Sequence, residues 1–329
     1  MGKIAFIIGE WFVYWSPLIL LLAAVAAALA FLALQQLDGS KLWRSVLIVL
    51  LAVAPSLVLG RLIYWYCRPD SFQSLTEALR GCDGSCLALV GAFAGCLLAA
   101  CMGRGLGLVE KLPRCLDHMA LAGGLGIAVG RLNHLFNTFD RGQVVGSLRV
   151  FPLVYPVENS VTGAEEYRLA TFMLQAMATL VITVVLTAVY LKNRRRLPGG
   201  DVCLLFLLAY GACQIFFDST RYDSLFLRSN GFVSMVQILS AASVLLPIVL
   251  FSVRMVRRRG FRRWALALWG GVLGLLAVAG IMEYFVQRRA NDAAFFYTFM
   301  VMALLGVIAL GGVLHGLSVS PQTKEQAQV

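Results

Sequence analysis

Long runs of apolar residues, separated by short polar segments, recur along almost the whole chain. A helix needs about 20 apolar residues to cross a hydrocarbon core of roughly 30 Å. The runs predict nine membrane-spanning helices, at residues 14–34, 44–66, 86–102, 115–135, 168–191, 201–219, 233–253, 264–284 and 294–317. The fourth run is the least hydrophobic, because it is rich in glycine and contains charged residues. We therefore expect an all-α fold, a polytopic helical bundle that crosses a membrane many times.

The basic residues are concentrated in the loops that follow the first, third, fifth and seventh runs, and the net charge is +11. Nine spans would place all four of these loops on one side of the membrane. The positive-inside rule assigns that side to the cytoplasm, so we expect the N-terminus outside and the C-terminus inside. Basic residues spread over short loops do not form the continuous surface that nucleic acid requires, so we expect no nucleic-acid partner.

The composition agrees with a membrane domain. Hydrophobic residues make up 60% of the 329 residues and charged residues 14%, whereas soluble domains have about 45–50% and about 25%. Most of the eight cysteines lie in apolar runs. Cys82 and Cys86 lie in or beside a polar loop, but no second ligand pair follows them, so we expect no metal and no cofactor. Whether they form a disulfide depends on the compartment that this loop faces.

Charged residues inside the apolar runs are candidate functional residues, because burying a charge in a membrane is costly. Arg61, Arg131 and Arg221 lie toward the outer ends of three different runs, and Asp218 accompanies Arg221. A guanidinium can bind a phosphate or carboxylate through two parallel hydrogen bonds. The three arginines therefore predict an anion site near the outer face. Alternatively, Arg61 extends to the headgroups and Arg221 pairs with Asp218 as a structural clamp.

Three segments resemble the prolipoprotein diacylglyceryl transferase family, and they occur in the order in which that family has them. Residues 116–137, which contain Gly130-Arg131, resemble its signature L-D-x-x-A-P followed by G-x-x-x-G-R-x-G-N-F-x-N-x-E. Residues 210–225 resemble its block Y-G-x-x-R-F-x-x-E-x-x-R-x-D-S-L. Arg61, Leu62 and Tyr64 resemble its R-L-x-Y. The resemblance covers about residues 1–253 and leaves the last two predicted helices, within residues 254–329, as an addition to a seven-helix core.

The resemblance implies an enzyme of the bacterial plasma membrane. Such a transferase moves the diacylglyceryl group of phosphatidylglycerol to the lipobox cysteine in the signal peptide of a prolipoprotein, and glycerol phosphate leaves. Its partners are then phosphatidylglycerol, the prolipoprotein and membrane lipid. The residues that we expect to be catalytic are Arg131, Arg221, Asp218, His134 and Tyr210. The residues that we expect to bind substrate are Arg61, Tyr64, Gly130, Asn137, Gln214 and Cys86.

The chain departs from the family pattern at several of these positions. Gln214 replaces the first arginine of the second block, and Cys86-Leu87-Ala88 replaces a His or Tyr followed by two glycines. Asn133-His134 replaces Gly-Asn, and only Asp140, one position late, matches the acidic residue of the signature. His134 either replaces a lost polar group or is simply packed. These departures leave two alternatives, a family member that binds anionic lipid or a lipoprotein precursor without catalysis, and a small-anion transporter.

Overall fold

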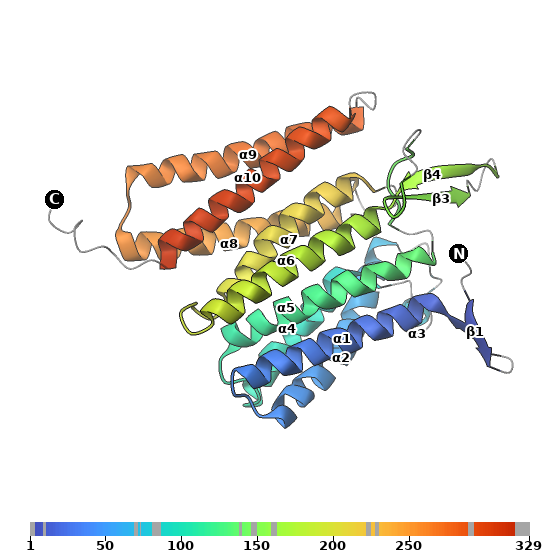
Figure 1. Cartoon of the computed structure of the whole chain (residues 1–329), viewed down its shortest axis with the longest axis horizontal. Coiled ribbons are helices and arrows are strands. Elements are labelled where there is room, and N and C mark those ends of the chain that lie inside the picture. The colour runs from blue at the N-terminus through green and yellow to red at the C-terminus, as the bar shows by residue number, and fades with distance from the viewer. Residues whose placement is uncertain are drawn as a thin grey trace.

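The computed structural model describes residues 4–8, 11–68, 72, 74–80, 87–137, 140–145, 150–158, 163–221, 225–227, 230–288 and 293–319. Within this part of the chain, long helices occupy all of the predicted positions (Figure 1). They are α1 Trp15–Leu37, α2 Leu42–Cys67, α4 Leu89–Gly105, α5 Leu112–Gly130, α6 Thr171–Asn193, α7 Asp201–Ser219, α8 Met235–Arg259, α9 Arg263–Arg288 and α10 Ala293–Val319. The predicted polytopic helical fold is confirmed.

Seven of the described helices, α1, α2 and α6 to α10, are long and apolar enough to cross a membrane. The helix α4 is apolar but has only 17 residues. The helix α5 packs against α1, α6 and α7, and it carries the glycines and charges that made the fourth run the least hydrophobic. The fourth run also ends differently from the prediction. The α-helix stops at Gly130, and Arg131–Leu135 form a 3₁₀ turn, η2.

Consecutive long helices run in opposite directions, so the four basic loops lie at one end of the bundle (Figure 1). Contacts across this end join the loops. Arg44 donates to Glu110 at 2.8 Å, and Arg194 donates to the carbonyl oxygen of Leu37 at 3.1 Å. We call this end the basic end and the opposite one the outer end. The prediction that the four loops share one side is confirmed, and the assignment of that side to the cytoplasm stays a prediction.

The outer end carries short elements that the apolar pattern did not predict. They are the hairpins β1 Ile4–Ile8 with β2 Trp11–Tyr14, β3 Val154–Glu158 with β4 Glu165–Leu169, and β5 Phe226–Leu227 with β6 Asn230–Ser234, and the short helix α3 Leu75–Arg80. In β3–β4 the register pairs Val154 with Leu169 and Glu158 with Glu165. This hairpin lies in the long polar stretch that connects the end of α5 to the start of α6.

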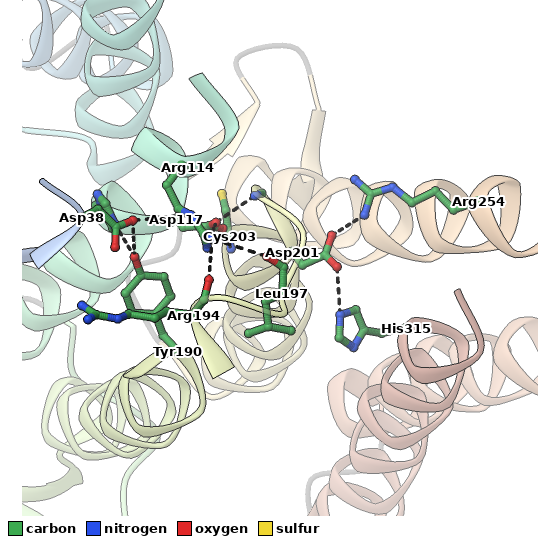
Figure 2. Close-up of polar contacts among 12 residues, drawn as sticks. Asp38, Arg114, Asp117, Tyr190, Arg194, Leu197, Asp201, Cys203, Arg254 and His315 are labelled. Carbon is green, nitrogen blue, oxygen red and sulfur yellow. Dashed lines mark hydrogen bonds and ion pairs between the residues drawn. The ribbon is translucent and has the colours of Figure 1, made fainter. Parts of the chain in front are cut away.

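A buried polar network holds the basic end together (Figure 2). Asp117 on α5 is fully buried and accepts hydrogen bonds from the backbone N–H groups of Gly200 and Cys203, each at 2.8 Å. These two groups belong to the start of α7, where backbone N–H groups have no partner within the helix. The Tyr190 hydroxyl on α6 lies 2.6 Å from His118 on α5 and donates to Asp38 at 2.7 Å. The network therefore fixes α5, α6 and α7 to one another.

The last two helices share a core with the preceding ones. Leu208 on α7, Phe251 on α8, and Met300 and Val307 on α10 belong to one cluster of buried side chains. Asp201, at the start of α7, pairs with Arg254 on α8 and lies 3.1 Å from His315 on α10 (Figure 2). The helix α9 packs along α10. A division of the chain at residue 253 stays a prediction, but the packing shows that α10 is anchored to α7 and α8.

Candidate functional site

One buried carboxylate joins two of the arginines that the sequence singled out. Arg131 follows the last residue of α5, and Arg221 lies just after the end of α7. Both pair with Asp140, Arg131 through Oδ2 and Arg221 through Oδ1. Asp140 is only 3% exposed. The structure thus brings the signature segment and the second block together at the outer end of the bundle, about one carboxylate.

The backbone around Asp140 explains how a loop residue reaches this position. Asp140 has a φ of +55°, in the left-handed region that Asp and Asn tolerate better than most residues. Its carbonyl oxygen accepts a hydrogen bond from the N–H of Phe172 at 3.2 Å. Gly142 then forms an isolated antiparallel bridge with Arg221. The loop is therefore bound to the start of α6 and to the end of α7.

Gly142 is at a position that has no room for a side chain. A Cβ atom there would lie 2.7 Å from the hydroxyl of Thr171, 2.9 Å from Cβ of Leu169 and 3.1 Å from the carbonyl oxygen of Thr220. These distances are shorter than van der Waals contacts. The absence of a side chain at Gly142 is thus what allows the loop to lie against Arg221.

Asp140 keeps its negative charge in this environment. Burial alone would raise the pKa of its carboxyl group, but Arg221 and Arg131 lower that pKa further than burial raises it. The result is a pKa well below the usual value for Asp. Removing one member of a buried charged pair is costly, because the remaining charge has lost both water and its partner. The carboxylate and the two guanidinium groups therefore act as one preorganised unit.

Asp218 is close to this unit but makes a longer contact with Arg221 than Asp140 does. Its Oδ1 lies 3.8 Å from a guanidinium nitrogen of Arg221, and the residue is 2% exposed. We expected Asp218 to orient Arg221. The geometry adds Asp140, which the sequence analysis mentioned only as a displaced match and did not place in the site.

His134 also lies in the cluster. Its Nε2 is 3.3 Å from Oδ2 of Asp140, and its Nδ1 is 2.9 Å from Oδ1 of Asn137. Asn137 in turn donates to Asn133 at 3.1 Å. These side chains meet because the turn η2 brings residues three and four apart onto one side. His134 and Asn137 were both predicted site residues, and the structure places them next to each other.

Arg141 closes the same turn, and the sequence analysis missed it. Its Nη2 donates to the carbonyl oxygens of His134 and Asn137, each at 3.0 Å. Its guanidinium stacks over the rings of Tyr155 and Phe172, 5.0 and 4.7 Å from their centroids. The pKa of Arg141 is lowered by burial. The one sequence feature that could have pointed to Arg141 is its position directly after Asp140. Arg141 lies outside any apolar run, so its charge did not mark it as a candidate functional residue.

Two predicted residues of α7 lie on the inner side of the cluster. Tyr210 is near Arg131 and interacts with it, and its ring stacks on Phe206 at 5.5 Å. Gln214 is 2% exposed and accepts a hydrogen bond from Gln175 on α6 at 3.2 Å. Where the family pattern has an arginine, this chain therefore has a buried pair of amides.

The other predicted residues lie in different surroundings. Arg61 on α2 donates to the carbonyl oxygen of Leu79 in α3. The ring of Tyr64 meets that of Phe72 edge to face at 6.1 Å. Gly130 faces Ala23 of α1, where an added Cβ would be 3.6 Å away. Cys86 lies outside the described residues, as does Cys82. The expected convergence of three arginines is thus seen for Arg131 and Arg221, while the partner described for Arg61 is in α3.

Within the described part of the chain, no group of three or more His, Cys, Asp and Glu residues is arranged to hold a metal ion. What the cluster offers is two fixed guanidinium groups, a carboxylate and an imidazole. Fixed cations of this kind suit a phosphate or another oxyanion, especially where negative charge develops during a reaction.

Comparison with known proteins gives consistent matches. The family described as prolipoprotein diacylglyceryl transferase matches residues 3–253. The phosphatidylglycerol–prolipoprotein diacylglyceryl transferase of Streptococcus equi subsp. zooepidemicus strain H70 is 25% identical over 249 residues, which cover 73% of this chain and 93% of that protein. The protein of the same name from Lactococcus lactis subsp. cremoris strain MG1363 is 30% identical over 134 residues, 41% of this chain and 49% of the relative. The family match over residues 3–253 covers both segments that meet at Asp140.

Proposed function

Because this chain belongs to the prolipoprotein diacylglyceryl transferase family, we propose that it transfers the diacylglyceryl group of phosphatidylglycerol to a cysteine thiol of a prolipoprotein. The acceptor is the lipobox cysteine at the end of the signal peptide. The location is the plasma membrane of a bacterium, with the cluster around Asp140 near the outer face. The observation that carries the proposal is the bridging of Arg131 and Arg221 by Asp140.

The chemistry explains why such a cluster is useful. The cysteine sulfur forms a bond to a carbon of the diacylglyceryl group, and the bond between that carbon and the phosphate oxygen breaks. Glycerol phosphate leaves with the bonding electrons, and the thiol proton passes to a base. Negative charge therefore grows on the phosphate, where Arg131 and Arg221 stabilise it. The Nε of Arg131 is buried and has no hydrogen-bond partner among the described residues, so a phosphate that enters the cluster would supply its missing acceptor.

His134 is the group that we assign to receive the thiol proton. A thiol has an unperturbed pKa of about 8.5, so a neighbouring base is needed for reaction near neutral pH. Asp140 lies 3.3 Å from Nε2 of His134 and can hold the ring in position. To accept the thiol proton, Nδ1 would have to leave the acceptor oxygen of Asn137 and carry no proton, with the ring proton on Nε2 toward Asp140. In the alternative, His134 only packs against the ring of Phe172, whose centroid is 6.2 Å away.

The main alternative is a family member that binds anionic lipid without transferring it. The amide pair of Gln214 and Gln175 favours this alternative, because it places no charge where the family pattern has an arginine. A small-anion transporter is less well supported, since the arginines gather at one end of the bundle and do not follow a path across it. A transfer assay separates the first two.

The test uses purified full-length protein in vesicles of phosphatidylglycerol with a labelled diacylglyceryl group, and a lipobox peptide as acceptor. We expect label on the peptide with the unchanged protein and none above background with Arg131→Ala. Arg288→Ala is the matched control, because Arg288 is an exposed arginine at the same outer end. His134→Ala and His134→Gln are measured beside it, and full activity in both would exclude the role as base. Binding of phosphatidylglycerol without any transfer would support the non-catalytic alternative.

A further inference from the structure

A long apolar groove lies between α8 and α9, at the other end of the bundle from the Asp140 cluster. Its volume is about 510 Å³, and residues from Leu245 to Arg257 on α8 and around Trp269 on α9 line it. The two helices are joined by the turn at Gly260 and, near the outer end, by a hydrogen bond between Gln237 and Glu283. Between these points α9 packs along α10, and α10 packs on α8. The groove is the space that this arrangement leaves open toward lipid.

The length of the groove matches one leaflet. Arg257 follows Leu245 by twelve positions, which is about 18 Å along a helix, and half of the hydrocarbon core is about 15 Å. The middle of the groove is apolar and accessible, since Val249 and Val253 are 54% and 42% exposed. Two of the polar side chains in its wall bond to each other, since Trp269 donates its indole N–H to the hydroxyl of Ser252 at 2.9 Å. Such a wall suits an acyl chain.

Positive charge is concentrated where the groove reaches the basic end. Arg257 lines the groove itself. Exposed arginines at positions 258, 262 and 263 surround the same turn. An arginine can hold a phosphate through two parallel hydrogen bonds, and a lipid headgroup lies at this depth when its chain lies in the groove. The charge favours a lipid with net negative charge over a zwitterionic one.

We propose that this groove binds one anionic phospholipid of the leaflet at the basic end, with an acyl chain between α8 and α9 and its phosphate on Arg257. The site is separate from the substrate site, which lies at the outer end. The length of the groove and the arginine at its end both favour an anionic lipid as its occupant.

Photo-crosslinking tests the proposal. Full-length protein is reconstituted with a photoactivatable phosphatidylglycerol or with phosphatidylcholine that carries the same photoactivatable chain, and the labelled peptides are mapped. We expect the phosphatidylglycerol probe to label segments of residues 245–273 more than the phosphatidylcholine probe does. Loss of one charge-assisted contact in Arg257→Gln should reduce labelling of these segments by about tenfold.

Arg262→Gln is the matched control, because it removes the same charge from the same turn at a residue that does not line the groove. A second variant, Val253→Trp, fills the groove at an accessible position and should abolish labelling there while Arg257 is kept. Equal labelling by the two probes, or an equal effect of the two arginine substitutions, would overturn the proposal. So would labelling of residues 245–273 that survives Val253→Trp in a folded protein.

Discussion

The hydroxyl of Tyr297 on α10 lies 3.2 Å from the carbonyl oxygen of Ser219, the last residue of α7, and donates a hydrogen bond to it. The same hydroxyl accepts a hydrogen bond from Gln143 at 3.2 Å. Gln143 follows Asp140 by three residues, and Ser219 precedes Arg221 by two. A helix outside the matched residues 3–253 therefore contacts both segments that bring Asp140 and Arg221 together.

Tyr297→Phe should reduce transfer because it removes both of these hydrogen bonds and keeps the ring. A typical hydrogen bond contributes about 1 kcal/mol, so the loss of both corresponds to about 2 kcal/mol, and we expect kcat to fall by up to roughly thirtyfold. The substrate contacts are unchanged, and KM for phosphatidylglycerol should stay the same. The measurement is steady-state transfer to a lipobox peptide. Tyr284→Phe on α9, an exposed residue, is the control, and an equal loss in both variants would contradict this role.

Asp140→Asn should abolish measurable transfer and destabilise the protein. It leaves two buried guanidinium groups without their shared carboxylate, and breaking a buried ion pair costs about 3–5 kcal/mol. The change is measured as transfer rate and as Tm in detergent. Glu165→Gln is the control, because Glu165 is an exposed acid in the outer hairpin β3–β4. Transfer by Asp140→Asn at the rate of the unchanged protein would show that the bridge is not needed.

The pH dependence of stability should reflect the lowered pKa of Asp140. A carboxyl group whose pKa is lower in the folded protein stabilises the fold above its unfolded pKa of about 3.9. That contribution is lost as pH falls from this value toward the folded pKa. Between pH 5 and 8 the difference in Tm between the unchanged protein and Asp140→Asn should thus be constant. It should shrink below about pH 4, and shrinkage already near pH 6 would contradict the assignment.

Gly142→Ala should impair transfer by displacing the loop that carries Asp140. The new methyl group would lie 2.7 Å from the Thr171 hydroxyl and 2.9 Å from Leu169, so one of these segments must move. Overpacking of this kind costs about 1–3 kcal/mol. Gly280→Ala is the matched control, because nothing lies within 4 Å of a Cβ atom at that helical position. Normal transfer and normal Tm in Gly142→Ala would indicate that the loop tolerates the movement.

Asp117→Asn should lower stability and leave the activity of the folded protein unchanged. Asp117 is fully buried and accepts hydrogen bonds from two N–H groups at the start of α7. The amide keeps one acceptor oxygen, so one N–H group loses its partner, at a cost of about 1–3 kcal/mol. Tm and transfer per folded molecule are measured together. Glu110→Gln is the control at the same end, because it loses only a solvent-exposed pair with Arg44, and such pairs contribute little to stability.

Much of the helical architecture could be predicted because a membrane imposes a strong pattern. Each span must be long and apolar, and successive loops must alternate between the two sides, with the basic loops on one of them. The positions of the helices and the gathering of the basic loops therefore followed from composition along the chain. The site was harder. Arg131, Arg221 and His134 were singled out, since charged and polar groups are conspicuous near apolar runs. Asp140 was noted only as a displaced match to the acidic residue of the signature and was not placed in the site, because it lies in a polar loop, where a charge is not costly as it is inside an apolar run.

The sequence by itself determined that the chain crosses a membrane repeatedly, which loops gather at the basic end, and which arginines lie near the opposite end of the bundle. Only the tertiary structure decided that Asp140 joins Arg131 to Arg221, that Arg61 instead has a partner in α3, and that Tyr297 supports both segments of the cluster. The physical reason is how far apart in sequence the interacting residues lie. Transfer into lipid depends on each residue and its neighbours along the chain, whereas these contacts depend on where loops and helix ends, far apart in sequence, come together.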